Sequence, residues 1–131
     1  MLSTDELLNG LPADQTLRFF ATFARFEFAM KQCGYLQRTE QGTVALASRE
    51  SLAADLPADF FVTIRDAAVA PVLVARPPKD LYVQDDRQPQ FGNQDPALTT
   101  TRQLLNAVWL VRNNLFHGNK MYPTTGTAMQ T

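Results

Sequence analysis

The sequence predicts an all-α protein organised around two long helices. Apolar residues recur at steps of three and four in two stretches, residues 12–33 and 96–118, and this spacing is typical of amphipathic helices. Shorter stretches of helical pattern lie between them. Five prolines from Pro71 to Pro96 break the pattern and predict a long loop there.

The composition indicates one globular domain. Of the 131 residues, 45% are apolar and 19% are charged, which supplies enough apolar surface for a core. We predict a single helical domain over residues 1–120. Because the remaining residues lack a hydrophobic period, we predict a disordered tail over residues 121–131.

Charge, cysteine content and hydropathy exclude several classes of function. The formal net charge of −1 argues against a broad basic surface for duplex nucleic acid, so any nucleic-acid contact must be local. One cysteine and one histidine cannot supply an intramolecular disulfide or a zinc ligand set, and we expect neither a metal nor a cofactor. Without an export signal or a run of 18 apolar residues, the chain is predicted to be cytoplasmic and to have no membrane partner.

Two helices are predicted in the first third of the chain. Ser3 and Glu6 have the spacing of a capping box, which predicts a short helix that ends at Gly10. The first long helix is predicted from Pro12 to Cys33, with proline in its first turn. Its apolar positions are Phe19, Phe20, Phe23, Phe26, Ala29 and Met30.

The middle of the chain has weaker signals. Residues 43–47 fit either a short strand or the irregular lead into a helix capped by Ser48, and we predict the irregular form. Two short helices are predicted at residues 49–56 and 59–69. The proline-rich stretch that follows is predicted as a loop or a β-ribbon insertion, with the ribbon around residues 81–83.

The second long helix is the clearest predicted element. Asp95 is its expected N-cap, Pro96 its first residue and Gly118 its stop. On an ideal helix the stripe that faces the core contains Leu104, Val108, Val111 and Leu115. A second stripe contains Asn106, Leu110, Asn113 and His117. Arg112 belongs to a third face, near Trp109 and Phe116.

The end of this helix, R-N-N-L-F-H from Arg112 to His117, is the candidate active site. Histidine titrates near neutral pH and can act as general base or acid, and arginine binds phosphate with a fixed bidentate geometry. Asn113 and Asn114 add orienting hydrogen bonds. Without a metal, the reaction natural to this set is attack of a ribose 2′-hydroxyl on its adjacent phosphate. That reaction requires RNA, excludes DNA and leaves a 2′,3′-cyclic phosphate.

Helical geometry separates the two candidate catalytic residues. Arg112 and His117 are about 140° apart around the axis and about 7.5 Å apart along it, so one helix points them in different directions. Two copies related by a two-fold axis can bring an arginine and a histidine from each chain into one cleft, which predicts a homodimer with a composite site. The same residues also fit an ordinary helix end, in which the cations complement the helix dipole and Gly118 is the C-cap.

At these residues the sequence resembles the HEPN family (higher eukaryotes and prokaryotes nucleotide-binding domains), whose hallmark is Arg, a polar residue and then His. The similarity extends over V-R-N-N-L-F-H-G-N-K in the second long helix and F-A-R-F-E-F-A-M-K-Q-C-G-Y in the first. It implies a HEPN-like helical bundle, commonly a dimer. Its active members are metal-independent endoribonucleases, and many serve as toxins of toxin–antitoxin or anti-phage defence systems.

The resemblance assigns roles to individual residues. It implies that Arg112 and His117 are catalytic, that Asn113 is supporting, and that Glu27 in the first long helix is a partner of Arg112. RNA is then the substrate, and an antitoxin protein is a further partner. Two other hypotheses remain open: a noncatalytic HEPN-like module that binds nucleotides, RNA or a protein, and a purely structural helical protein. Trp109 and the phenylalanines are expected to pack in the core or a dimer interface.

Overall fold

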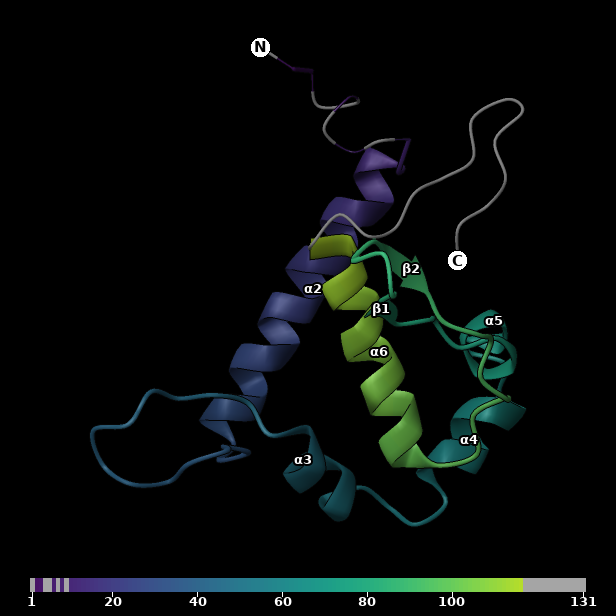
Figure 1. Cartoon of the computed structure of the whole chain (residues 1–131). Coiled ribbons are helices and arrows are strands. Elements are labelled where there is room, and N and C mark those ends of the chain that lie inside the picture. Colours follow the sequence, from purple (N-terminus) through teal and green to yellow (C-terminus); the bar gives the residue numbers. More distant parts are fainter. Residues whose placement is uncertain (1, 4–5, 7, 9, 117–131) are drawn as a thin grey trace.

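The computed structural model of the chain describes residues 2–3, 6, 8 and 10–116 (Figure 1). Its helices are α2 (Ala13–Gln32), α3 (Arg49–Asp55), α4 (Phe60–Asp66), α5 (Pro71–Ala75) and α6 (Thr101–Phe116). Its strands are β1 (Leu81–Val83) and β2 (Pro89–Phe91). The predicted helix stop at Gly118, the tail over residues 121–131 and His117 lie outside the described residues.

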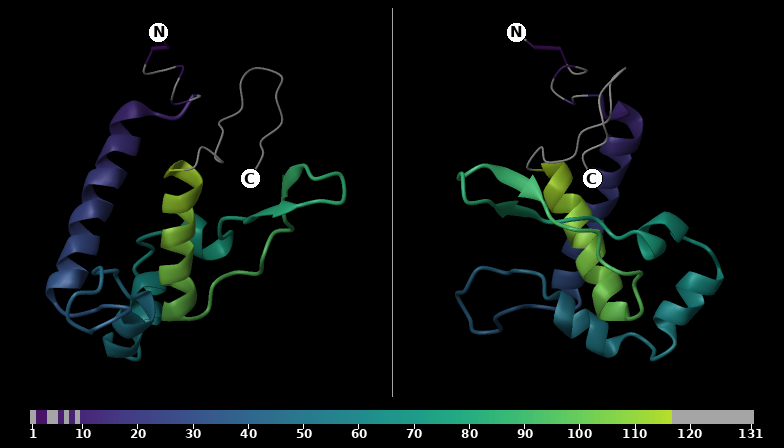
Figure 2. Two further views of the ribbon diagram at one scale, coloured as in Figure 1. Left: turned by 60° about the vertical axis from the view of Figure 1, so that its left-hand side comes forward. Right: turned by 45° about the vertical axis from the view of Figure 1, so that its right-hand side comes forward.

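Helix α6 lies at the centre of the arrangement. It runs antiparallel to α2, and α3 lies at the foot of both long helices (Figures 1 and 2). On the other side of α6 are the short helices α4 and α5, while the β1–β2 ribbon projects outward (Figure 2). The two long helices and α3 therefore form one side of the molecule, and α4, α5 and the ribbon form the other.

The core consists of two clusters that share α6. The first cluster joins α2, the segment before α3, and α6 through Phe23, Met30, Ala47 and Trp109. The second joins α4, α5 and the first turns of α6 through Phe61, Val74 and Leu104. Burial of these apolar side chains is the main force that holds the short elements on α6.

The predicted all-α class, and with it the HEPN-like bundle, is wrong. About 51% of the described residues are helical, and these residues also contain a two-stranded antiparallel sheet, so the architecture is mixed. Strand β1 pairs with β2 in the register Leu81–Phe91, Tyr82–Gln90 and Val83–Pro89. The physical reason lies in the prolines, which lack an N–H and prevent a helix between α5 and α6, so that extended backbone pairs with itself.

The first long helix is confirmed within one residue at each end. Pro12 precedes α2, and its carbonyl accepts a hydrogen bond from the Thr16 hydroxyl at 2.7 Å. At the other end, the Cys33 N–H donates to the Ala29 carbonyl and Gly34 has a φ of +88°. Glycine adopts this left-handed conformation without strain, so it ends the helix.

The segment between α2 and α3 is tied by a short antiparallel contact. Leu36 and Ala47 form an isolated β-bridge, and the Ser48 N–H donates to the Tyr35 carbonyl at 2.9 Å. Residues 43–47 are otherwise irregular, as predicted. The Ser48 side chain accepts a hydrogen bond from the Ser51 N–H and caps α3, which confirms the predicted cap.

Helices α4 and α5 differ from the sequence prediction. Helix α4 is shorter than the predicted 59–69, because Ala68 takes a φ of +52° and interrupts the helical backbone. Helix α5 was not expected, since it occupies the start of the proline-rich stretch. Pro71 stands in its first turn, where a missing N–H costs no hydrogen bond.

Helix α6 begins later than predicted. Asp95 and Pro96 lie in an extended segment, and the Leu98 N–H donates to the Val74 carbonyl at 2.8 Å. Thr100 is the cap instead, because its hydroxyl accepts a hydrogen bond from the Gln103 N–H at 3.1 Å. The contact with α5 holds this stretch extended and overrides its local preference for a helix start.

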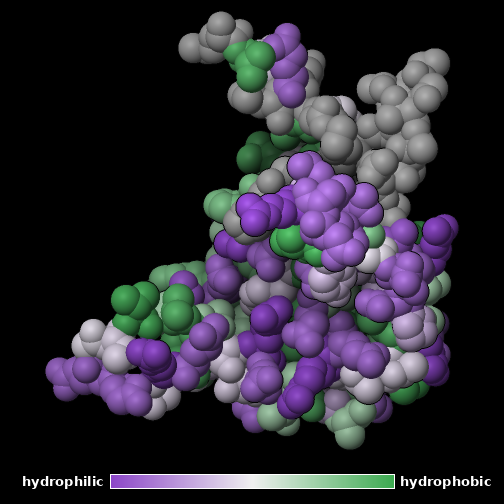
Figure 3. All heavy atoms as spheres, in the orientation of Figure 1, coloured by the Kyte–Doolittle hydropathy of each residue, from purple (hydrophilic) through white to green (hydrophobic). Residues whose placement is uncertain are grey.

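Several large hydrophobic side chains lie on the surface. Phe28 and Phe116 are 60% and 63% exposed, on α2 and α6 respectively. Hydrophobic residues also gather on the loop between α2 and α3, where Val44 and Leu46 are exposed (Figure 3). None of the helices in the described part of the chain is long and apolar enough to span a membrane.

Candidate functional site

Arg112 lies in the last two turns of α6 with its guanidinium group between aromatic rings. Its Nη1 donates a hydrogen bond to Asn113 Oδ1 at 2.9 Å. The guanidinium carbon is 4.9 Å from the centre of the Phe116 ring and 6.0 Å from that of Phe23. These contacts orient a half-buried cation on the side of α6 that faces α2.

The surface around Arg112 is a shallow groove between α2 and α6 with a volume of about 440 Å³. It is lined by Phe20, Phe23, Ala24, Glu27, Arg112 and Phe116. Glu27 and Arg112 were expected to be partners, and the structure brings both to this groove. They do not form an ion pair, since Arg65–Asp66 is the only salt bridge between described residues.

The two neighbouring asparagines of the motif lie in different environments. Asn113 is half-buried and lines a polar cleft on the side of α6 that faces residues 77–80. Asn114 is only 6% exposed, and its Nδ2 donates to the backbone carbonyl of Lys79 at 3.2 Å. Asn113 therefore links Arg112 to the polar cleft, whereas Asn114 connects α6 to the chain before the ribbon.

The polar cleft has a volume of about 580 Å³, which is within the usual range for small-ligand sites. Residues from α6 that line it include Gln103, Asn106, Leu110 and Asn113, which matches the second stripe predicted from the helical period. Its other lining groups include Arg49 from α3 and the carboxylates Asp80 and Asp95. The cleft can thus offer one fixed cation, several amides and two hydrogen-bond-accepting carboxylates.

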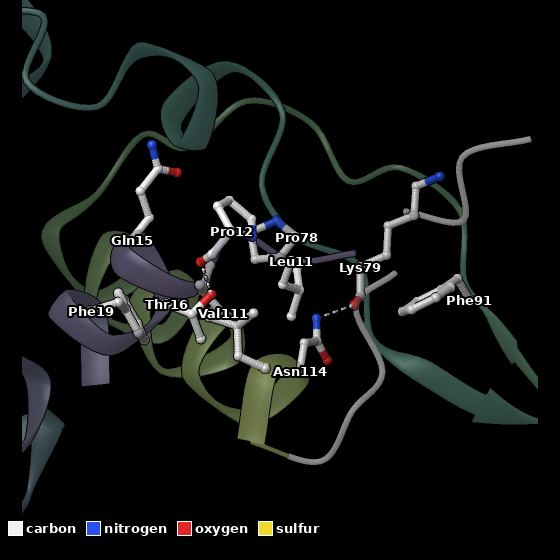
Figure 4. A pocket seen from close by; sticks show the side chains of 11 residues that line it. Leu11, Pro12, Gln15, Thr16, Phe19, Pro78, Lys79, Phe91, Val111 and Asn114 are labelled. Atoms are coloured by element: carbon white, nitrogen blue, oxygen red, sulfur yellow. Dashed lines mark hydrogen bonds between the residues drawn. The ribbon is translucent and has the colours of Figure 1, made fainter. Parts of the chain in front are cut away.

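An apolar cavity of about 240 Å³ lies where the start of α2 meets the end of α6. Figure 4 shows that Asn114 and Val111 face into it from α6, and that Thr16 and Phe19 face it from α2. The hydrogen bond from Asn114 to Lys79 crosses one of its walls (Figure 4). Apart from the amides of Gln15 and Asn114, the Thr16 hydroxyl and Lys79, the described residues that line it are apolar, and Arg112 is not among them.

Trp109 packs in the core as predicted, since it is 8% exposed and contacts Phe23 edge to face at a ring separation of 4.8 Å. Its ring also makes a cation–π contact with Arg49, whose guanidinium carbon lies 5.5 Å from the ring centre. The sequence analysis missed Arg49, because its contact with Trp109 joins residues that are 60 positions apart. The only local signal is an arginine at the first position of a helix, where a cation opposes the helix dipole.

Comparisons of the chain with models of protein families, with curated proteins and with solved structures found no match. Arg112 and Arg49 supply two oriented cations, and Asn113 lies in the cleft that Arg49 lines while it accepts a hydrogen bond from Arg112. This arrangement suits a ligand with negative charge and hydrogen-bonding groups.

Proposed function

We propose that the protein is a metal-independent endoribonuclease whose active site is formed by Arg112 and His117 and completed by a second copy of the chain. The observation that carries the proposal is that the guanidinium group of Arg112 is held in a fixed orientation. It is fixed by Asn113 and two rings, and no carboxylate of the described residues neutralises it. An arginine kept in this state is suited to bind a phosphate through two parallel hydrogen bonds.

The proposed reaction needs only groups of the RNA and of the protein. One histidine takes the proton of the ribose 2′-hydroxyl, and the 2′-oxygen forms a bond to the adjacent phosphorus. The bond from phosphorus to the 5′-oxygen breaks, and the leaving oxygen receives a proton from a second histidine. Arg112 stabilises the extra negative charge of the phosphorane between these steps. The products are a 2′,3′-cyclic phosphate and a free 5′-hydroxyl.

The need for two histidines supports a composite site, because each chain contains one. The groove beside Arg112 supports it as well. Phe116 is 63% exposed and Phe26 is 41% exposed, on the two helices that form the groove. Such rings are typical of protein interfaces, and a second copy would remove them from water. The position of His117 is predicted from the helical period of α6 alone.

The decisive experiment is RNA cleavage by the purified protein in the presence of EDTA. Wild-type protein should cut single-stranded RNA, leave single-stranded DNA intact and produce 2′,3′-cyclic phosphate ends. Arg112→Ala and His117→Ala should each lower the rate by at least about a hundredfold, the usual scale for loss of a transition-state charge partner or a general base. Arg25→Ala, an exposed arginine on α2, is the matched control and should cleave normally. Full activity of His117→Ala would refute the proposal.

The polar cleft favours a second candidate, a noncatalytic module that binds RNA or a nucleotide. Its volume and its mixture of one arginine, two carboxylates and several amides are those of a binding site and do not require catalysis. This candidate predicts calorimetric binding of a nucleotide or an oligoribonucleotide with no cleavage at any pH. Binding that accompanies cleavage, with both lost in Arg112→Ala, would favour the enzyme.

A further inference from the structure

Arg49 is a second half-buried arginine that the proposed reaction does not use. It is the first residue of α3, where a positive charge is unfavourable to the helix dipole. Between described residues its guanidinium makes no ion pair and has only the contact with the Trp109 ring, 5.5 Å from the ring centre. A cation that is held in place yet unneutralised is available to an anionic ligand.

Aromatic rings connect Arg49 to Arg112. Arg49 lies over Trp109, the Trp109 and Phe23 rings are 4.8 Å apart, and Arg112 lies 6.0 Å from the Phe23 ring centre. Both rings are buried, so their positions are fixed by the core. This series of contacts limits the separation of the two guanidinium groups to a length that one short oligonucleotide can span.

We propose that Arg49 and Arg112 bind different phosphates of one single-stranded RNA, with Arg112 at the cleavage site and Arg49 at another phosphate of the same strand. The inference rests on the proposed function and adds to it the class of substrate. A duplex is disfavoured because the net charge is −1 and the cations are local. Asn113 lies in the cleft of Arg49 and accepts a hydrogen bond from Arg112, so it lies on the path of a strand between them.

The two carboxylates in the same cleft shape what can bind there. Asp80 and Asp95 repel phosphate and accept hydrogen bonds, so they favour the amino groups of an unstacked base over the strand's phosphates. Arg49 is thus the group in the cleft that holds the phosphate, and the carboxylates contact the base. A base that donates from an exocyclic amino group, such as guanine, adenine or cytosine, should bind better than uracil.

The test measures binding without cleavage. A 2′-O-methyl oligoribonucleotide lacks the attacking hydroxyl, and its affinity can be followed by the fluorescence of Trp109, the single tryptophan of the chain. On single strands each phosphate contact contributes about 0.7 to the slope of log affinity against log salt concentration. Arg49→Gln should therefore lower the slope by about 0.7 and weaken binding about fivefold at 0.1 M salt. Arg49→Gln should also reduce the change in Trp109 emission that accompanies binding of the oligonucleotide.

Two controls keep the result specific. Arg49→Lys preserves the charge and should keep the wild-type slope, while Arg102→Ala removes an exposed arginine of α6 and should leave both slope and affinity unchanged. Circular dichroism of each variant shows whether the fold is intact. An unchanged slope in a folded Arg49→Gln protein would overturn the proposal.

The outcome also separates this inference from the proposed function. Suppose that the salt slope falls in Arg49→Gln but the wild-type protein never cleaves unmodified RNA. That result supports the two-arginine contact and refutes the nuclease. Cleavage by wild-type protein together with a slope that is indifferent to Arg49 refutes the contact and leaves the nuclease in place.

Discussion

Asn114 donates a hydrogen bond to the Lys79 carbonyl and so links the last turn of α6 to the chain just before strand β1. The two residues are 35 positions apart, and the asparagine is 6% exposed. The bond fixes the segment that separates the apolar cavity from the polar cleft, since Pro78 lines both. Asn114, which the motif suggested as part of the site, therefore supports the wall of the site and does not line the polar cleft itself.

Loss of this link should destabilise the fold. Asn114→Ala leaves the Lys79 carbonyl without that donor in a part-buried setting, and we expect it to lower the free energy of unfolding by about 1–3 kcal/mol. Asn106→Ala, which removes an exposed asparagine of the same helix, is the control and should change stability by less than about 0.5 kcal/mol. Urea unfolding followed by Trp109 fluorescence measures both. Equal stabilities for the two variants would show that the Asn114 contact is not structural.

The α2–α6 core should depend on Phe23 far more than on its exposed neighbour. Phe23 is 7% exposed and contacts Phe19 and Trp109, whereas Phe28 on the same helix is 60% exposed. We expect Phe23→Ala to cost about 3–5 kcal/mol, the usual range for truncating a buried phenylalanine. Phe28→Ala should cost little, and thermal unfolding can compare them. A large loss in Phe28→Ala would instead indicate that the exposed face of α2 is covered in solution.

The start of α6 should depend on Thr100. Its hydroxyl accepts the Gln103 N–H, and the Gln103 side chain in turn accepts from the Thr99 N–H at 2.8 Å. Thr100→Ala should lower stability by about 0.5–2 kcal/mol, while Thr100→Ser keeps the oxygen and should have almost no effect. Asp95→Ala tests the sequence-based cap and should be neutral, because Asp95 lies in the extended segment before the helix. A loss of stability in Asp95→Ala but not in Thr100→Ala would indicate that the helix begins at Asp95, as the sequence predicted.

Tyr35 should titrate at higher pH than an ordinary tyrosine. A hydrogen bond to the Asp55 carboxylate, followed by desolvation and charge repulsion, raises the pKa of Tyr35 above 10.0. The unfolded chain therefore loses this proton first, so the contribution of Tyr35 to stability is complete below pH 10 and declines as the pH rises through the folded pKa. Ultraviolet titration in a Tyr82→Phe, Tyr122→Phe background measures the pKa.

Replacing the carboxylate gives the matching control. Asp55→Asn should bring the pKa of Tyr35 down toward 10.0, because the negative charge that disfavours the phenolate is gone. Asp59→Asn, four residues along the chain, should leave the titration unchanged. A pKa that does not respond to Asp55→Asn would mean that another group causes the shift.

Local sequence patterns predicted the elements whose determinants are local. The bounds of α2 follow from Pro12, its apolar period and Gly34, and the cap of α3 follows from Ser48. The second stripe of α6 was also predictable, because a helix of known period places Asn106 and Asn113 on one side. Each of these depends on interactions within a few residues of the chain.

Long-range contacts decided the rest. The segment around Leu98 could not be distinguished from a helix start by its composition, because its extended form depends on the Val74 carbonyl. For the proline-rich stretch the sequence left a loop and a β-ribbon open. Only the rest of the fold, which holds both strands, decides that β1 pairs with β2. Asn113 and Asn114 look alike in sequence and differ only in what α6 packs against.

By itself, then, the sequence determined the two long helices over most of their length and the position of Arg112 near the end of the second, because helical period and capping are local. Spacing within α6 already places Phe116 beside Arg112, but only the tertiary structure decided that Arg112 also lies near Phe23, and that Arg49 joins it through Trp109. Packing of α2, α3 and α6 around one core creates those contacts. No spacing within a single segment encodes them.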